Sequence, residues 1–340
     1  MSHPLLEQCQ TILLQYRLRA DYIEDYGKVK KVFTSSGVFA LKQLPNSNSW
    51  RSLANVHRLF QGKAIPIYPT SDGRFFVAAG DEVYYLMPWI SEQEEQRSEK
   101  HLKMFRDLAH IHQSTIKEIE VKEEDITNFY NTIKKQREKR RDFLQSYVEA
   151  CEDEWYMSPF QLQFCTFFHE TMRAYWFSLT QLENWYEKIK ELKKWRVAVV
   201  HGHPSLSHYV HDKQGNGYFL SFERSHVAPP LSDIICFFRQ YLHSLPIRCE
   251  ECISWIVEYD NVFSSREEEK SLFLSYFSEP LMIYRLVANY AKTKGKRVER
   301  EHVAHLQRAY WEMKNIEYVI GRLGEFEEKK HLQEESHATS

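Results

Sequence analysis

Four histidines fall within eleven residues, at His201, His203, His208 and His211. Imidazole titrates near neutral pH, so His203 could serve as a general base, and imidazole is also a common zinc ligand. A zinc site would need the four rings to converge, which residues spaced along a bent loop need not do, so we disfavour it. Ser221 lies ten residues after His211, and Glu223 lies two positions further along the chain. On an extended strand their side chains would face the same way, which makes Glu223 the candidate carboxylate of this stretch.

The segments around these residues have strong strand and turn signals. The apolar, β-branched run at residues 197–200 predicts a buried strand that leads into His201. Two short strand-prone segments follow, at residues 209–211 and 218–220, and the Asn216-Gly217 turn between them predicts a hairpin.

The first 90 residues are rich in strand signals, and nearly everything after Ser91 reads as helix except residues 196–223. The predicted strands of the first part lie at residues 37–44, 74–77 and 82–87, with one amphipathic helix at residues 48–61. Lys42 lies in the first of these strands. It is either a nucleotide contact or a strand lysine that reaches solvent, and the sequence favours neither.

Helix starts in the second part carry capping signals. Capping boxes are predicted at residues 91–94 and 265–268, and Ser158-Pro159 predicts a further start. After Pro159, phenylalanines recur at helical spacing, at Phe160, Phe164, Phe167 and Phe168. Such an aromatic stripe is typical of a helix face that packs in the core. Asp233 is predicted to cap a helix, and Pro280 to start another. The last long helix is expected over residues 297–323, followed by a polar, frayed tail at residues 325–340.

Composition excludes several classes of protein. The chain has 340 residues, is 43% hydrophobic and carries a net charge of −2, which suits two lobes and offers no overall field for nucleic acid. We expect no membrane insertion, because no stretch has the apolar length of a span and the first residues lack a signal peptide's pattern.

The basic block at residues 134–141 is predicted to be a solvated helix face. Six scattered cysteines predict reduced thiols, with Cys249 and Cys252 a thiol pair on one helical turn rather than a metal site.

Taken together, these segments resemble the bacterial spore-coat kinase-like family, of CotS and YsxE type, within the aminoglycoside/choline-kinase-like superfamily. The resemblance covers about residues 20 to 320 and rests on the order and spacing of the matching segments: residues 39–42, 67–73, 84–90, 108–114, 201–208, 218–223 and 229–234. It implies an α+β, two-lobed protein-kinase-like fold. The implied division is a β-rich N-terminal lobe (1–88), a mostly helical C-terminal lobe (89–324) with the catalytic loop at 201–223, and the polar tail.

The reactive positions of the family depart from its pattern here. By spacing, the family's catalytic Asp falls on His203, its metal-binding Asn on His208 and its metal-binding Asp on Ser221. Mg²⁺ prefers hard oxygen ligands, so the loss of both metal ligands points to a degenerate site. Lys42 also lacks the family's helix glutamate, because no acidic residue occurs between Gln43 and Ser71.

The resemblance therefore implies a catalytically inactive, structural or interacting protein of the spore coat, a pseudokinase made in the mother-cell cytoplasm. Its expected partners are other spore coat proteins, and no nucleic acid, metal or cofactor is expected. Two alternatives stay open: an atypical phosphotransferase that uses ATP and Mg²⁺ with Glu223 as its carboxylate, and a nucleotide-binding sensor without turnover.

Overall fold

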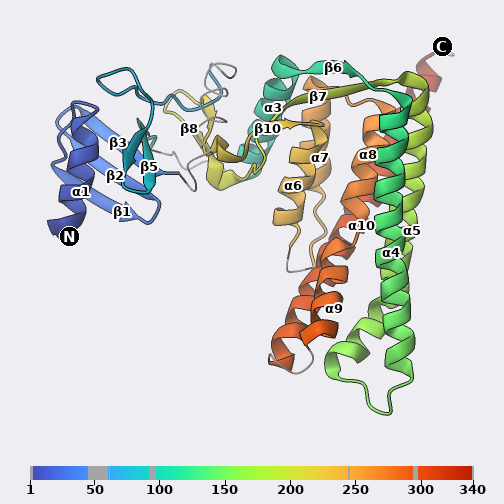
Figure 1. Cartoon of the computed structure of the whole chain (residues 1–340). Coiled ribbons are helices and arrows are strands. Elements are labelled where there is room, and N and C mark those ends of the chain that lie inside the picture. Colours follow the sequence, from blue (N-terminus) through green and yellow to red (C-terminus); the bar gives the residue numbers. More distant parts are fainter. Residues whose placement is uncertain are drawn as a thin grey trace. The chain divides into compact units, whose positions relative to one another are not determined.

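The computed structural model describes residues 3–44, 60, 62–91, 97–243, 246–293 and 298–338. The chain forms two compact units (Figure 1): Met1–Ile116 with Ala198–Ala228, and Lys117–Val197 with Pro229–Ser340. The predicted lobes, divided at residue 88, follow a different boundary, and that division stays a prediction. Of the predicted helix at 48–61 and the capping box at 91–94, all but Phe60 and Ser91 lie outside the described residues.

The first unit contains a five-stranded antiparallel sheet in the order β1-β2-β3-β5-β4. Its strands are β1 (Tyr22–Tyr26), β2 (Val29–Thr34), β3 (Gly37–Gln43), β4 (Val77–Ala79) and β5 (Glu82–Pro88). The β4–β5 hairpin confirms the prediction of paired strands there, although β4 begins at Val77 rather than at residue 74. Helix α1 (His3–Leu14), which the sequence reasoning did not predict, packs Ile12 and Leu13 against Ile23, Val32 and Leu41 of the sheet.

The candidate loops lie in the same unit, after helix α3 (Arg97–Thr115). The last three residues of strand β7 (Lys194–Val200) pair with β10 (His226–Ala228) and lead directly to His201. Between them, β8 (Tyr209–His211) and β9 (Gly217–Phe219) form the predicted hairpin, flanked by the 3-10 turns η1 (Leu206–His208) and η2 (Phe222–Arg224).

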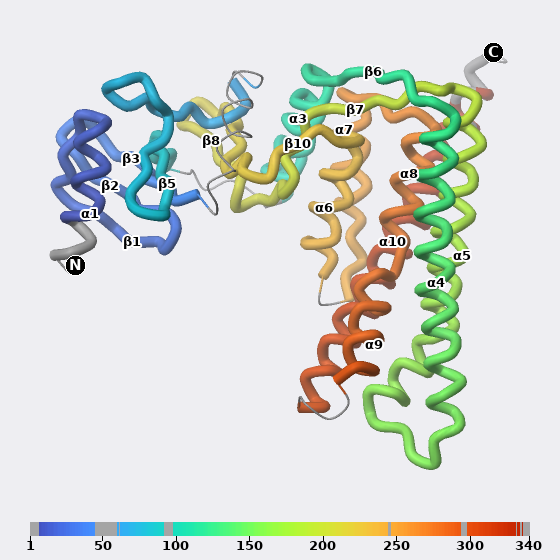
Figure 2. The backbone as a smooth tube through the Cα atoms, in the orientation of Figure 1, coloured from blue at the N-terminus to red at the C-terminus, as the bar shows by residue number. Residues whose placement is uncertain are grey.

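The second unit is mainly helical. Its short strand β6 (Lys117–Glu120) pairs with the first four residues of β7. The long helices α4 (Glu123–Glu152) and α5 (Pro159–Leu192) form a hairpin, as the tube in Figure 2 shows. The remaining helices are α6 (Leu231–Tyr241), α7 (Glu251–Val262), α8 (Glu267–Ser278), α9 (Leu281–Thr293) and α10 (Glu299–Ala338). None of the described helices combines the length and apolar character needed to cross a membrane.

The phenylalanine stripe of α5 lies in the core, as predicted. Phe160, Phe164 and Phe168 are buried in a cluster with residues of α4, α9 and α10, and Phe167 packs against it. Ser158 forms the predicted cap, since its hydroxyl accepts from the Gln161 amide and the Gln161 side chain accepts from the Ser158 amide. The local cap and the apolar period together explain why the helix begins where it does.

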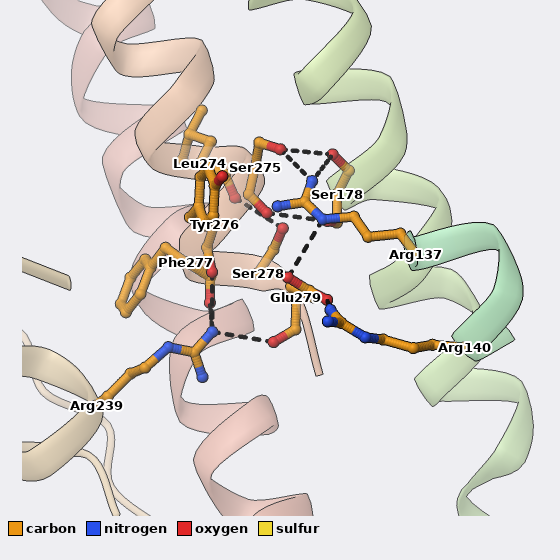
Figure 3. Close-up of polar contacts among 10 residues, drawn as sticks. All are labelled: Arg137, Arg140, Ser178, Arg239, Leu274, Ser275, Tyr276, Phe277, Ser278 and Glu279. Atoms are coloured by element: carbon orange, nitrogen blue, oxygen red, sulfur yellow. Dashed lines mark hydrogen bonds and ion pairs between the residues drawn. The ribbon is translucent and has the colours of Figure 1, made fainter. Parts of the chain in front are cut away.

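Part of the predicted solvated helix face at residues 134–141 is instead buried. Arg137 is fully buried, its Nη1 donates to the Ser178 carbonyl (3.2 Å), and its Nε lies 3.2 Å from Glu279. Arg140 also bonds Glu279. Figure 3 shows how these groups meet at the C-terminal end of α8, where Arg239 donates to three backbone carbonyls. The prediction was wrong for Arg137 because its partners Ser178, Ser275 and Glu279 lie on segments far away in the sequence that pack against this side of α4.

Three further expectations need correction. Cys249 and Cys252, predicted as thiols, form a disulfide with Cα atoms 5.4 Å apart, within the range that a bridge can span. Helix α8 begins at Glu267 after Arg266, whose amide donates to Glu269, so the cap lies one residue later than predicted. Asp233 is buried within the first turn of α6 rather than at its N-cap, which is Pro230.

The end of the chain also differs from the expected frayed tail. Helix α10 does not stop near Gly324 but continues to Ala338. Two ion pairs involve residues of this extension: Arg322 pairs with Glu325, and Lys270 pairs with Glu327. Glutamate and lysine are good helix formers, so one glycine costs too little to end the helix.

Candidate functional site

Lys42 and Glu223 form a buried ion pair at the centre of the candidate site. The Nζ atom of Lys42 lies 2.7 Å from Oε1 of Glu223 and donates to Oγ of Ser221 at 2.5 Å. The Tyr85 hydroxyl donates to the same carboxylate oxygen at 2.9 Å. Tyr85 is also the cross-strand neighbour of Lys42, so the β3–β5 register itself places the hydroxyl and the ammonium on one carboxylate.

Burial makes this pair electrostatically strong. The side chains of Lys42 and Glu223 are 12% and 7% exposed. Burial alone would raise the pKa of Glu223, but the charge and hydrogen bond of Lys42, together with the hydrogen bonds from the backbone and from Tyr85, outweigh it, and the pKa lies below its ordinary value. Burial, with the Glu223 charge beside it, raises the pKa of Tyr85 well above its ordinary value, so the phenol keeps its proton as a donor.

The backbone around Ser221 has an unusual conformation that presents Glu223 to Lys42. Ser221 has φ of +66°, in the left-handed region that few non-glycine residues adopt, and it precedes the turn that carries Glu223. Gly202 (φ +80°) approaches this turn so closely that a Cβ atom there would lie 2.3 Å from the carbonyl oxygen of Arg224. Only glycine permits this approach of the two loops.

The histidines organise the loop rather than converge on one point. His201 is fully buried; its Nδ1 accepts from the His203 amide (3.2 Å), so its Nε2 carries the proton that bonds the Leu220 carbonyl (2.7 Å). The Nδ1 of His208 donates to the His203 carbonyl at 3.1 Å. Burial, with a smaller contribution from the charge of Lys42, lowers the pKa of His208, which favours its neutral form. His211 is buried with its ring 4.8 Å from that of Tyr209.

Across the part of the chain that the structure describes, no three His, Cys, Asp or Glu side chains gather closely enough to hold a metal ion. His203 has a buried Nδ1 atom without a hydrogen-bond partner among these residues. Its ring centroid lies 5.3 Å from that of His208.

The sequence-predicted residues are thus brought together in part. Lys42 was given two roles, a nucleotide contact or a strand lysine that reaches solvent. Its side chain is 12% exposed and its ammonium is paired with Glu223, so the second is wrong, and the first stays a prediction. Its expected lack of an acidic partner is corrected, because Glu223 supplies a carboxylate from a different segment. Tyr85 was not anticipated as a site residue, and only its place opposite Lys42 on an adjacent strand could have indicated it.

Comparison with known proteins shows the fold. No protein-family model matches the chain, and no curated protein matches it. Among solved structures, an aminoglycoside phosphotransferase from Alicyclobacillus acidocaldarius is similar over 97% of this chain and 98% of its own, with a TM-score of 0.72 and 16% identity. The spectinomycin phosphotransferase APH(9)-Ia, with ADP and spectinomycin bound, is similar over 94% of this chain and 99% of its own, with a TM-score of 0.53 and 11% identity.

These likenesses confirm the predicted fold class. The chain has the kinase-like phosphotransferase fold, with a small antiparallel sheet in its N-terminal part and a large helical C-terminal part. At such low identity the comparison concerns the fold alone, and the chemistry must be argued from the residues of the site.

Proposed function

We propose that this protein is a catalytically inactive member of the kinase-like fold, with a structural or interaction role in the spore coat. The proposed inactivity rests on the engagement of Glu223. In active kinases one carboxylate pairs with this lysine and a different one binds the metal, whereas here Glu223, the candidate carboxylate for the metal, is itself the partner of Lys42 at 2.7 Å.

The donor set around the pair supports the proposal, because it does not fit Mg²⁺. At the three positions aligned with the family's reactive residues, this chain carries His203, His208 and Ser221. Two imidazoles and a hydroxyl are poor substitutes for carboxylate and amide oxygens. Glu223, the remaining carboxylate, already accepts from both Lys42 and Tyr85. Without a divalent cation, the charge that phosphoryl transfer develops on phosphate oxygens would remain uncompensated.

Purified protein with ATP and Mg²⁺ tests the inactive assignment. We expect no shift of the thermal unfolding midpoint and no release of ADP above the rate without protein, with an active aminoglycoside phosphotransferase as the positive control. Turnover that is lost in Glu223→Ala, in a protein that remains folded, would instead establish the atypical phosphotransferase. Calorimetric binding of ATP without turnover, measured with and without the metal, would establish the sensor.

The spore-coat role is supported by the resemblance described above and needs its own test. A fluorescent fusion, expressed from the protein's own promoter in a sporulating cell, is expected to gather around the developing spore. A signal that stays evenly spread through the mother cell would contradict the role in the coat, whatever the ATP experiment shows.

A further inference from the structure

The second compact unit contains a cavity of about 660 Å³ that the proposed function does not use. This volume lies in the range of ordinary ligand sites. Helices α4, α5, α6, α8 and α9 supply most of its lining. Its walls are largely apolar, and they include Ile133 of α4, Ile235 of α6 and Leu272 and Phe273 of α8.

Three aromatic rings close one end of the cavity. The ring centroids of Phe129, Trp185 and Trp195 lie 5.3 to 5.5 Å from one another. Leu272 packs into the same cluster. Glu268 precedes Leu272 by one helical turn, so it lies on the same face of α8, at this aromatic end of the cavity.

Glu268 is a buried acid with no hydrogen bond or ion pair to any residue that the structure describes. It is only 7% exposed. Arg196 attracts it electrostatically, but the guanidinium of Arg196 is already held by both carboxylate oxygens of Glu269. The N-terminal turn of α8 favours a negative charge there, yet a carboxylate in an apolar wall remains costly until a cation meets it. Aromatic rings beside such a carboxylate also suit a cation.

The part of the cavity near the end of α8 carries both arginines and glutamates in its lining. Arg140 is bonded to Glu279, and Arg239 is bonded to Glu312 and to carbonyls at the end of α8 (Figure 3), so these charges balance one another. Arg285 of α9 also lines the cavity, is exposed, and has no hydrogen bond, ion pair or ring contact within the described part of the chain. Arg285 is therefore the cation that remains available to an anionic group.

The cavity extends along α8 further than one small ion could bridge. Along α8, Glu268 and Glu279 are eleven residues apart, which is about 16 Å at the helical rise. Arg285 follows in the second turn of α9. An extended polypeptide covers this distance with about five residues. It can also carry a basic group at one end, apolar side chains in the middle and an acidic group at the other end.

We propose that this cavity binds an extended segment of a partner polypeptide, with a lysine or arginine at Glu268, apolar residues between the helices and an acidic residue at Arg285. The complementarity of charge at the two ends, across an apolar middle, selects this occupant. The proposal deepens the interaction role given above, and its test involves no nucleotide, so the two can fail separately.

Synthetic peptides of about six residues test it. We would use two capped libraries with mixed Leu, Val, Ile and Phe in the middle. One has Arg first and Asp last, and the other has the reverse order, so that both N-to-C directions of a bound chain are tested. A matched library has Gln and Asn at the ends. Retention of each library on the immobilised full chain is quantified by mass spectrometry. We expect one charged library to be retained about tenfold or more over the neutral library.

Variants locate the binding. Glu268→Gln is expected to reduce the preference for the charged library over the neutral one, while Glu267→Gln, on the exposed neighbour, keeps it. Arg285→Gln is also expected to reduce this preference, and Arg308→Gln, an exposed arginine of α10, to keep it. Thermal unfolding of each variant shows whether it is folded. Equal retention of the charged and neutral libraries, or full displacement of the peptides by spermidine or tetramethylammonium, would overturn the proposal.

Discussion

Replacing Lys42 by methionine should destabilise the protein strongly, because it leaves the Glu223 charge buried. At 2.7 Å and an effective dielectric constant of about 20, the attraction within the pair is about 6 kcal/mol before desolvation is subtracted. Removing one member of a buried pair costs about 3–5 kcal/mol. Since Tyr85 still donates to the carboxylate, we expect the lower end, about 3 kcal/mol, in the free energy of unfolding measured with urea.

A double variant distinguishes this reasoning from a simple loss of packing. In Lys42→Met with Glu223→Gln no charge is left unpaired, so the loss should shrink to about 1 kcal/mol. The control is Lys31→Met on the neighbouring strand, where the pair with Glu24 spans 3.3 Å and is 22% and 32% exposed; it should cost at most about 1 kcal/mol. If Lys42→Met were as stable as the wild type, or the double variant no better than the single one, Lys42 would not be held in a structural pair.

Three further changes follow from contacts described above. Gly202→Ala should lower the free energy of unfolding by about 1–3 kcal/mol, because the added methyl meets a carbonyl oxygen at 2.3 Å on a backbone with positive φ. Urea unfolding measures this loss, and wild-type stability would contradict the contact. Arg137→Met should cost about 3 kcal/mol, the lower end for breaking a buried pair, because Arg140 still bonds Glu279; urea unfolding measures it, and wild-type stability would contradict the pair. The pKa values of His208 and Glu223 are both lowered in the fold from 6.5 and 4.5, so each group favours folding above its ordinary pKa. Each contribution is lost as the pH falls from that value through the lower folded pKa. Urea midpoints should therefore drop in two stages, one beginning below about pH 6.5 and one below about pH 4.5, and a flat profile would refute this.

Local signals were enough to predict the elements that local contacts determine. The start of α5 follows from Ser158, Pro159 and the aromatic period, all within a few residues. The β8–β9 hairpin follows from the glycine-rich turn and the strand-prone segments on both sides, although the turn centres near Gly215 and Gly217 is already the first residue of β9. In each case the residues that decide the structure are neighbours in the sequence.

Contacts between distant segments could not be predicted in this way. Lys42 and Glu223 were each recognised as candidates, yet nothing in either segment indicates that they meet. Arg137 lies in a basic block that is mostly outward-facing, and its partners Ser178, Ser275 and Glu279 belong to other helices. The disulfide between Cys249 and Cys252 depends on how the start of α7 places the two side chains.

The first compact unit is discontinuous in the sequence, and this affects its synthesis. Its segment Ala198–Ala228 carries Glu223, while Lys42 lies in Met1–Ile116. A ribosome that adds about 5–20 residues per second needs about 4–16 s to translate residues 117–197, which separate the two segments. During that interval the nascent sheet exists with Lys42 but without the carboxylate that neutralises it. A chaperone or a premature contact would thus encounter this unit in an incomplete form that the finished chain never shows.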